Sequence, residues 1–236
     1  VYCREHGHKG ICSESEWRQV ERDIKLAAET GCQYHVCHVS TKESVELIRR
    51  AKAAGLKVSG ETAPHYLLLC DEDLQEDGRF KMNPPLRSRE DVEALRMGLK
   101  NGIMDVISTD HAPHSEEEKN RSIEKASFGI VGLETSAALT YTELVKTGVL
   151  SIMDMAEKMS YNPAQILGLT EKGAVAEGKI ADLVIFDPDA NYKIDKNTFF
   201  SKGKNTPFDG REVYGRVEYT LADGEIVYEY QDTRKV

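Results

Sequence analysis

Several features are missing from this sequence of 236 residues, and each absence narrows the range of functions. It contains no run of about 18 apolar residues, and its first residues lack the basic and apolar order of a signal peptide, so neither a membrane span nor a secretion signal is visible. No long run of lysine and arginine occurs, and the net charge of −9 argues against binding to a phosphate backbone. We therefore expect neither a membrane nor a nucleic acid as a partner.

The sequence also lacks the short motifs of several enzyme classes. No Gly-x-x-x-x-Gly-Lys phosphate loop and no Gly-x-Ser-x-Gly nucleophile elbow occurs, which argues against nucleotide-driven chemistry and serine hydrolysis. The five cysteines are odd in number and contain no Cys-x-x-Cys pair. Reduced thiols, and hence a cytoplasmic protein, are the expectation.

The first half of the chain alternates between strand and helix patterns. Strands are expected over residues 34–39, 58–62 and 105–109, and amphipathic helices lie before and between them. Such alternation predicts parallel strands in an α/β sheet or barrel. Residues 115–121 form a polar stretch that we expect to be a loop.

Three capping boxes are expected to start these helices. The spacing of serine and an acidic residue predicts them at Ser13 with Glu16, Ser40 with Glu43, and Ser88 with Asp91.

In the second half of the chain, the sequence pattern changes from helical to strand-like near Gly173. Helices are expected over 134–146, 152–159 and 163–167, the last with Asn162 as its cap. Strands are expected over 181–186, 216–221 and 225–230, the last two joined by a hairpin at Asp223-Gly224. We therefore predict two domains, residues 1–172 and a small β-rich module over residues 173–236.

Two strand ends carry side chains suited to catalysis. Asp110 follows the strand over 105–109, and His38 ends the strand over 34–39. The carboxyl ends of barrel strands form the active-site face, where these groups could bind a metal, and Asp110 could act as a base on metal-bound water. The alternatives are a half-buried strand histidine and a loop-capping aspartate. His111 and His114 close to Asp110 favour a functional cluster.

Other polar residues are candidates for weaker reasons. Asn83 lies in Met82-Asn83-Pro84-Pro85-Leu86-Arg87, where the prolines could fix its amide toward a substrate, although turn chemistry explains it equally well. His65 lies beyond a strand end and is expected to be structural or to support a ligand. His35 faces away from His38 and is expected to be structural.

Together these motifs resemble the class I dihydroorotases, metal-dependent (β/α)8 barrels of the amidohydrolase superfamily. The resemblance covers nearly the whole chain. The motifs that carry it are His35-Val36-Cys37-His38-Val39-Ser40-Thr41, Met82 to Arg87, Ser108-Thr109-Asp110-His111-Ala112-Pro113-His114, Phe128-Gly129-Ile130-Val131-Gly132-Leu133-Glu134-Thr135 and Asn205-Thr206-Pro207-Phe208-Asp209-Gly210.

The resemblance implies a fold and a reaction. The fold would be the C-terminal part of a (β/α)8 TIM-type barrel followed by a small β-sandwich-like module. The reaction would be the zinc-dependent, reversible cyclisation of N-carbamoyl-L-aspartate to L-dihydroorotate in pyrimidine biosynthesis. His38 and Asp110 would bind a pair of zinc ions, and Asp110 would also shuttle the proton. Substrate would be held by Asn83, by His114 and by the backbone at Phe128 and Gly129.

The family has a His-x-His pair with an adjacent arginine near the end of its first strand, and a bridging carboxylate and a further histidine before its sixth strand. None of these is found at such a place in this sequence. The resemblance therefore implies the C-terminal portion of a longer protein, inactive by itself, which associates with another copy or with other chain segments. Two alternatives are a non-catalytic relative that partners aspartate transcarbamoylase and a cyclic amidase of the hydantoinase or allantoinase type.

Overall fold

The computed structural model describes residues 2–231, and its contacts divide the chain into two compact units. Unit 1 consists of the stretch up to Ser136 together with Asp195–Gly210. Unit 2 consists of Ala137–Ile194 together with the stretch from Arg211 onward. Strands and helices alternate in unit 1, whereas unit 2 contains helices followed by long strands. The chain is therefore a mixed α/β protein.

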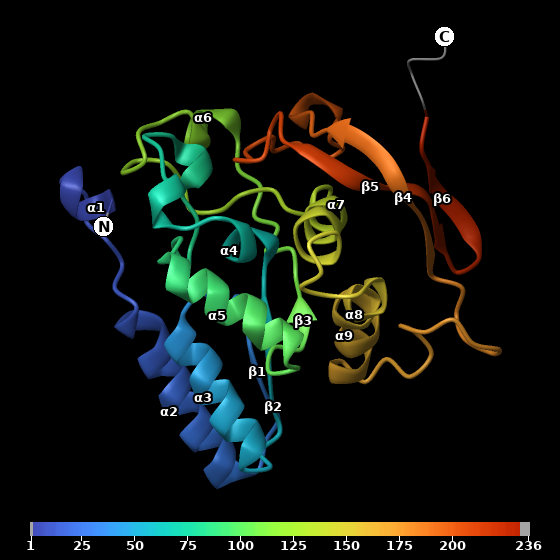
Figure 1. Cartoon of the computed structure of the whole chain (residues 1–236), viewed down its shortest axis with the longest axis horizontal. Coiled ribbons are helices and arrows are strands. Elements are labelled where there is room, and N and C mark those ends of the chain that lie inside the picture. Colours follow the sequence, from blue (N-terminus) through green and yellow to red (C-terminus); the bar gives the residue numbers. More distant parts are fainter. Residues whose placement is uncertain (1, 232–236) are drawn as a thin grey trace. The chain divides into compact units, whose positions relative to one another are not determined.

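Three short parallel strands form the sheet of unit 1 (Figure 1). In their order across the sheet, they are β1 (Tyr34–Val36), β2 (Val58–Thr62) and β3 (Val106–Ile107). Tyr34 pairs with Val58, and Thr62 pairs with Ile107. This pairing confirms the parallel arrangement expected from the alternating pattern. The carboxyl ends of the three strands consequently lie at one edge of the sheet.

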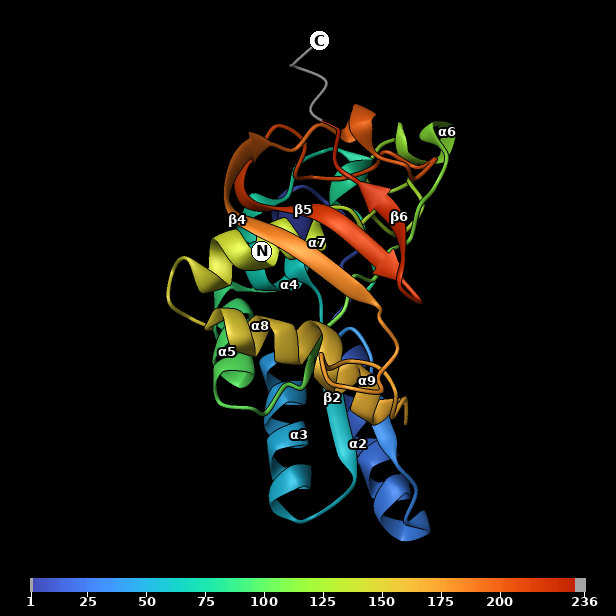
Figure 2. The ribbon, with the colours of Figure 1, turned by 90° about the vertical axis from the view of Figure 1, so that its right-hand side faces the viewer.

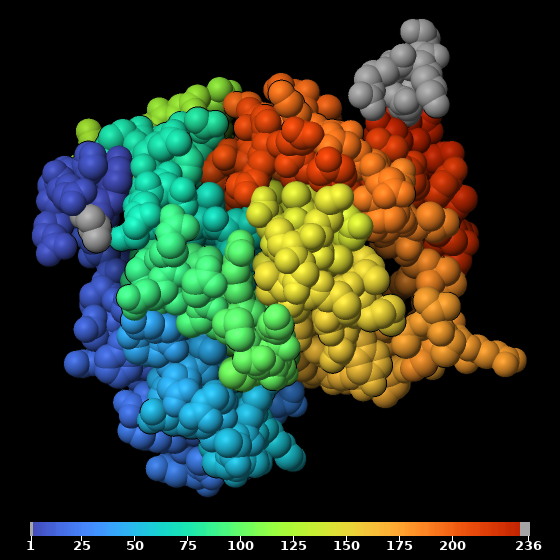
Figure 3. All heavy atoms as spheres, viewed as in Figure 1, coloured from blue at the N-terminus to red at the C-terminus, as the bar shows by residue number. Residues whose placement is uncertain are grey.

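Helices flank these strands, and three of the longer ones pack together. The helical segments of unit 1 are α1 (Tyr2–Glu5), α2 (Glu14–Thr30), α3 (Lys42–Ala53), α4 (Pro64–Leu68), η1 (Asp71–Asp73), η2 (Gly78–Phe80), α5 (Arg89–Lys100), α6 (Glu116–Lys119) and η5 (Lys196–Thr198). α3 contacts both α2 and α5 (Figure 1), and α3 adjoins α5 in the space-filling view (Figure 3). α6 lies in the stretch that the sequence predicted as a loop.

The core of unit 1 is built by the apolar stripes of these helices. Ile48 of α3 and Leu95 and Leu99 of α5 are at most 1% exposed, at the spacing that places residues on one face of a helix. Val36 of β1 and Ile107 of β3 are buried as well. Burial of these side chains fixes the strands, and therefore the positions of the strand ends that carry the candidate residues.

The start of α5 confirms one predicted cap, and the start of α2 contradicts another. Ser88 accepts a hydrogen bond from the amide of Asp91, whose side chain accepts one from the Ser88 amide, which is the predicted capping box. The predicted box of Ser13 with Glu16 is wrong, because Ser13 has helical backbone angles and makes no side-chain cap. Glu16 instead points to the loop after β1.

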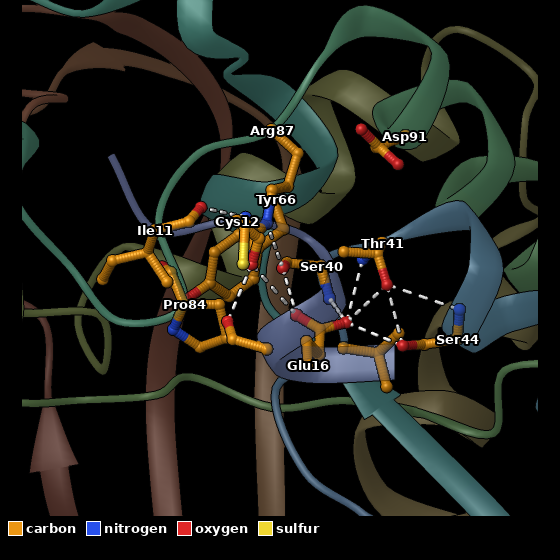
Figure 4. Close-up of polar contacts among 12 residues, drawn as sticks. Ile11, Cys12, Glu16, Ser40, Thr41, Ser44, Tyr66, Pro84, Arg87 and Asp91 are labelled. Atoms are coloured by element: carbon orange, nitrogen blue, oxygen red, sulfur yellow. Dashed lines mark hydrogen bonds and ion pairs between the residues drawn. The ribbon is translucent and has the colours of Figure 1, made fainter. Parts of the chain in front are cut away.

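Glu16 gathers the hydroxyl and amide groups of that loop (Figure 4). Its carboxylate accepts hydrogen bonds from the amides of Ser40 and Thr41, at 3.1 and 3.0 Å, and from the hydroxyls of Ser40, Thr41 and Ser44. Because Ser40 is engaged in this way, the predicted pairing of Ser40 with Glu43 is wrong. Thr41 caps α3 in its place, by accepting a hydrogen bond from the Ser44 amide.

Unit 2 contains short helices and one antiparallel sheet (Figure 2). Its segments are α7 (Ser136–Thr140), which begins at the last residue of unit 1's first stretch, the π-helical turns η3 (Tyr141–Val145) and η4 (Glu157–Tyr161), α8 (Ile152–Ala156), α9 (Asn162–Ile166), β4 (Leu183–Lys193), β5 (Glu212–Ala222) and β6 (Glu225–Glu229). The expected cap at Asn162 is wrong, because η4 runs directly into α9 and Asn162 is itself helical.

The predicted hairpin joins β5 to β6. Asp223 and Gly224 both have positive φ angles, 51° and 82°, which two-residue hairpin turns of the primed type require. The domain boundary after residue 172 stays a prediction. None of the helices within residues 2–231 is long and apolar enough to cross a membrane.

We expect the Glu16→Gln variant to lose stability, because a neutral amide cannot accept all the hydrogen bonds that the carboxylate accepts. The expected loss in the free energy of unfolding is roughly 1–3 kcal/mol, as for buried donors left without partners. Urea denaturation of the purified chain measures it. Glu14→Gln, an exposed change in the same helical turn, is the control. Equal losses for the two variants would contradict this role of Glu16.

Candidate active site

His38 and Asp110 lie just beyond the ends of β1 and β3, and both have an unusual backbone. Their φ angles are 41° and 45°, in the left-handed region that residues other than glycine rarely occupy. Such a conformation costs on the order of 1–3 kcal/mol and is often found at functional sites. His38 also helps to lower the pKa of Asp110, so the two side chains interact electrostatically. The structure thus brings these two predicted residues to the same edge of the sheet.

Asp110 faces the buried imidazole of His65. His65, in α4, is 2% exposed, and its Nε2 lies 3.7 Å from Asp110 Oδ2, too far for a hydrogen bond. Within residues 2–231 this Nε2 is buried without a hydrogen-bond partner. Burial lowers the pKa of His65, which keeps the ring neutral near pH 7. Burial would raise the pKa of Asp110, but its neighbours, His38 and Tyr66 among them, outweigh this effect and lower the pKa, so the carboxylate is ionised near pH 7.

A second carboxylate, Glu61 in β2, lies beside the His38 backbone. Glu61 Oε1 accepts a long hydrogen bond of 3.4 Å from the His38 amide, and Oε2 lies 3.3 Å from His35 Nε2. The other His35 nitrogen lies 2.7 Å from the Ser59 hydroxyl. Burial opposes ionisation of Glu61, yet hydrogen bonds from His35 and Ser108 lower its pKa. His35 therefore serves this network, which fits its expected structural role.

Asn83 is exposed between two buried neighbours, Met82 and Pro84. The Tyr66 hydroxyl donates a 2.8 Å hydrogen bond to the Pro84 carbonyl, which fixes the backbone next to Asn83. Asn83 and His38 both line a cavity of about 370 Å³, whose lining does not include Asp110. The amide of Asn83 is therefore free to meet a ligand in the cavity that His38 also reaches.

Arg87 ties the Asn83 segment to the loop after β1 (Figure 4). It is 8% exposed, and its Nε donates to the Ser40 hydroxyl at 3.1 Å while Nη1 donates to the Ile11 carbonyl at 2.7 Å. Its Nη2 lies 3.8 Å from a carboxylate oxygen of Glu16. Because the guanidinium is planar and has five donors, it can hold all three partners at once. Arg87 thus has a structural role here.

His114 and the segment of Phe128 and Gly129 form one hydrogen-bonded group. The His114 Nε2 lies 2.7 Å from the Phe128 carbonyl oxygen. The Asn205 side chain accepts a 3.3 Å hydrogen bond from the His114 amide and donates one of 3.0 Å to the Gly129 carbonyl. His111 instead accepts hydrogen bonds from the backbone amides of Gly132 and Leu133. The structure brings His114, Phe128 and Gly129 together as a second group of predicted residues.

The donor atoms at the strand ends fit part of a metal centre. His38 offers a ring nitrogen and Asp110 an ionised carboxylate, both of which zinc accepts, but a catalytic zinc has three protein ligands. Within residues 2–231, His35, Cys37 and Glu61 are the group of three whose ligand atoms lie within 4.8 Å of one another. His35 and Glu61 already contact each other there. We therefore expect other residues to complete a metal centre at His38 and Asp110.

Sequence reasoning missed several contributors to this site. No role was predicted for Glu61 and Asn205, although Asn205 stands in one of the motifs, and Glu16 was predicted only to cap its own helix. Their partners lie 23 to 91 residues away along the chain, as for Glu61 with His38 and Asn205 with His114, and no local pattern reports such contacts. A charged residue inside a predicted strand, as Glu61 is in residues 58–62, was the available signal.

Comparison with known proteins shows clear relatives. Residues 2–227 match the family model described as the Amidohydrolase family. A protein of Brevibacillus brevis named dihydroorotase is 52% identical over 231 residues, which are 97% of this chain and 54% of that protein. The dihydroorotase of Bacillus cytotoxicus is 50% identical over 229 residues, 97% of this chain and 53% of that protein. The chain thus spans about half the length of these relatives.

Solved structures with the same fold include two hydantoinases. L-hydantoinase from Arthrobacter aurescens superimposes with a TM-score of 0.86 at 37% sequence identity, over 90% of this chain and 48% of its own. D-hydantoinase from a Thermus species gives a TM-score of 0.88 at 26% identity, over 96% of this chain and 53% of its own.

We expect Gly129→Ala to destabilise the segment beside His114. The φ angle of Gly129 is +130°, and a Cβ there would lie 2.5 Å from the Ala112 Cβ and 2.8 Å from the Ala112 carbonyl oxygen. Gly102→Ala is a matched control, because Gly102 also has a positive φ but has open space around it. Denaturation should show an additional loss of roughly 1–3 kcal/mol for Gly129→Ala. Equal losses would show that the close packing is unimportant.

Proposed function

Because the chain belongs to the amidohydrolase family, we propose that it supplies the β1–β3 part of a dihydroorotase active site. The enzyme would interconvert N-carbamoyl-L-aspartate with L-dihydroorotate and water. The observation that carries the proposal is the convergence of His38 and the ionised Asp110 at one sheet edge, both with left-handed backbones. The identity of about 50% to proteins named dihydroorotase supports this substrate over others.

We also propose the arrangement of the strands beyond the site. β1, β2 and β3 would be consecutive strands of a (β/α)8 barrel, and its other strands would lie outside the part that the structure describes. Parallel pairing, with helices following the strands, supports this arrangement. The hydantoinase superpositions support it as well. Residues 173–236 would form the β-rich module.

Each predicted site residue would act in a distinct way. Zinc held in part by His38 and Asp110 would polarise the ring carbonyl and lower the pKa of a bound water. Asp110, kept ionised by its neighbours, would accept the proton of the attacking water and return it to the leaving ring nitrogen. Asn83 would hydrogen-bond a polar edge of the substrate, and His114 with the backbone at Phe128 and Gly129 would hold another.

A cyclic amidase that acts on hydantoin-like rings is the second candidate, favoured by the superposition on L-hydantoinase. A non-catalytic partner of aspartate transcarbamoylase is a third, but the joint presence of His38, Asp110, Asn83 and His114 argues against it. Self-association and a cytoplasmic location stay predictions.

We expect the purified 236-residue chain to show no turnover of dihydroorotate with added zinc. His38 and Asp110 provide too few ligands to hold a catalytic zinc ion by themselves. The decrease in dihydroorotate absorbance on ring opening measures turnover. Turnover by the purified chain that the Asp110→Asn variant lacks would overturn this expectation.

We expect activity when the chain is fused to the complementary part of the Brevibacillus brevis relative, which the resemblance places ahead of it. Asp110→Asn should lower the turnover of this fusion by about 10²–10⁴-fold, since the amide cannot accept the proton. Asp189→Asn, at an exposed position in β4, is the control and should be neutral.

The fusion also separates the candidates. Turnover of dihydroorotate, lost in Asp110→Asn, supports the proposed function. Turnover of hydantoin without turnover of dihydroorotate would replace it with the second candidate. A folded, zinc-loaded fusion that turns over neither substrate would contradict it.

A further inference from the structure

A buried lysine lies between the two substrate-binding segments. Lys119, the last residue of α6, is 3% exposed. Its Nζ donates hydrogen bonds to three carbonyl oxygens, those of Lys81 at 3.1 Å, Ser127 at 2.8 Å and Gly129 at 2.8 Å. An ammonium group has three N–H donors, so each of them has its own acceptor.

The three carbonyls belong to the segments that carry the predicted substrate-binding residues. Lys81 stands two residues before Asn83, and Ser127 and Gly129 stand on either side of Phe128. The Gly129 amide also donates to the Lys81 carbonyl at 3.0 Å, so the two segments are joined directly as well. Lys119 therefore connects the two segments, and we call its three hydrogen bonds the bridge.

Lys119 interacts with its surroundings through the three N–H donors of its ammonium group. Among residues 2–231 its Nζ forms no salt bridge, and the charge of nearby Asp77 only partly offsets the effect of burial. A buried cation that forms no salt bridge is costly unless hydrogen bonds compensate it, and here three backbone carbonyls do so. The backbone around it is closely packed, since a Cβ on Gly78 would lie 2.2 Å from the Lys119 carbonyl oxygen.

We propose that Lys119 is a positioning residue that holds the Asn83 segment and the Phe128–Gly129 segment together for substrate binding. The role in substrate binding rests on the proposed function, whereas the hydrogen bonds of the bridge are present in this chain in any case. The bridge extends to His114, because the Gly129 carbonyl also accepts a hydrogen bond from Asn205, whose side chain binds the His114 amide.

The charge state of Lys119 gives the bridge a dependence on pH. Burial lowers the pKa of Lys119 to about 8, the charge of nearby Lys81 acts in the same direction, and Asp77 opposes both. Above that pH the neutral amine has only two N–H donors for three carbonyls. The bridge should therefore weaken as the pH rises through about 8.

Hydrogen exchange of the purified chain tests the proposal without any assay of activity. In Lys119→Met we expect the amides of Ser127 and Gly129 to lose protection by roughly 10- to 100-fold, and the amide of Ser108 beside β3 to keep it. Lys125→Met, an exposed change in the same segment, is the control and should leave all three amides unchanged.

The unmodified chain provides a second measurement, which is valid even if Lys119→Met fails to fold. After correction for the intrinsic exchange rate, protection at Gly129 should fall between about pH 7 and pH 9.5, while that at Ser108 stays constant. Unchanged protection at Gly129 in a folded Lys119→Met variant, or across this pH range, would overturn the role of Lys119. An inactive fusion would contradict the proposed function alone, because these exchange rates do not depend on it.

Discussion

The parallel pairing of β1, β2 and β3 is the constraint on which the candidate site depends. Because Tyr34 pairs with Val58 and Thr62 with Ile107, the three strands end at one edge, and the chain must turn sharply there. His38 and Asp110 occupy two of these turns in the left-handed conformation. A backbone that is unfavourable for most residues persists only where the surrounding structure holds it. Two side chains far apart in sequence thereby come to share one electrostatic environment.

Buried polar groups hold the loops beyond this edge. Glu16 and Arg87 fix the loop after β1 to the segment of Asn83, and Asn205 fixes His114 to Gly129. In each case a charged or amide side chain satisfies backbone groups that no strand or helix satisfies. Several hydrogen bonds to each of these side chains offset the cost of its desolvation. The loops can therefore be ordered without regular secondary structure of their own.

The sequence predicts the local part of this arrangement well. The three parallel strands, the Ser88 cap and the Asp223-Gly224 hairpin follow from patterns a few residues long, and the structure confirms them. The caps at Ser13 and Ser40 are wrong because Glu16, an ordinary capping partner by spacing, finds better donors across the fold.

The candidate site was predictable to a similar extent. Motifs pointed to His38, Asp110 and Asn83, whose roles stay predictions. The burial of His65 against Asp110 depends on where α4 packs, which no local spacing reveals. The bridge at Lys119 was not predicted, because Lys119 lies in a polar stretch whose composition is typical of an exposed loop.

We propose that His38 and Asp110 share a metal centre that needs further ligands. The most direct measurement is the zinc content of the fusion with the Brevibacillus brevis segment, determined by native mass spectrometry. We expect the fusion to retain zinc, and the His38→Ala and Asp110→Asn variants each to retain less, whereas Asp189→Asn retains as much. Zinc content that neither His38→Ala nor Asp110→Asn reduces would contradict the account.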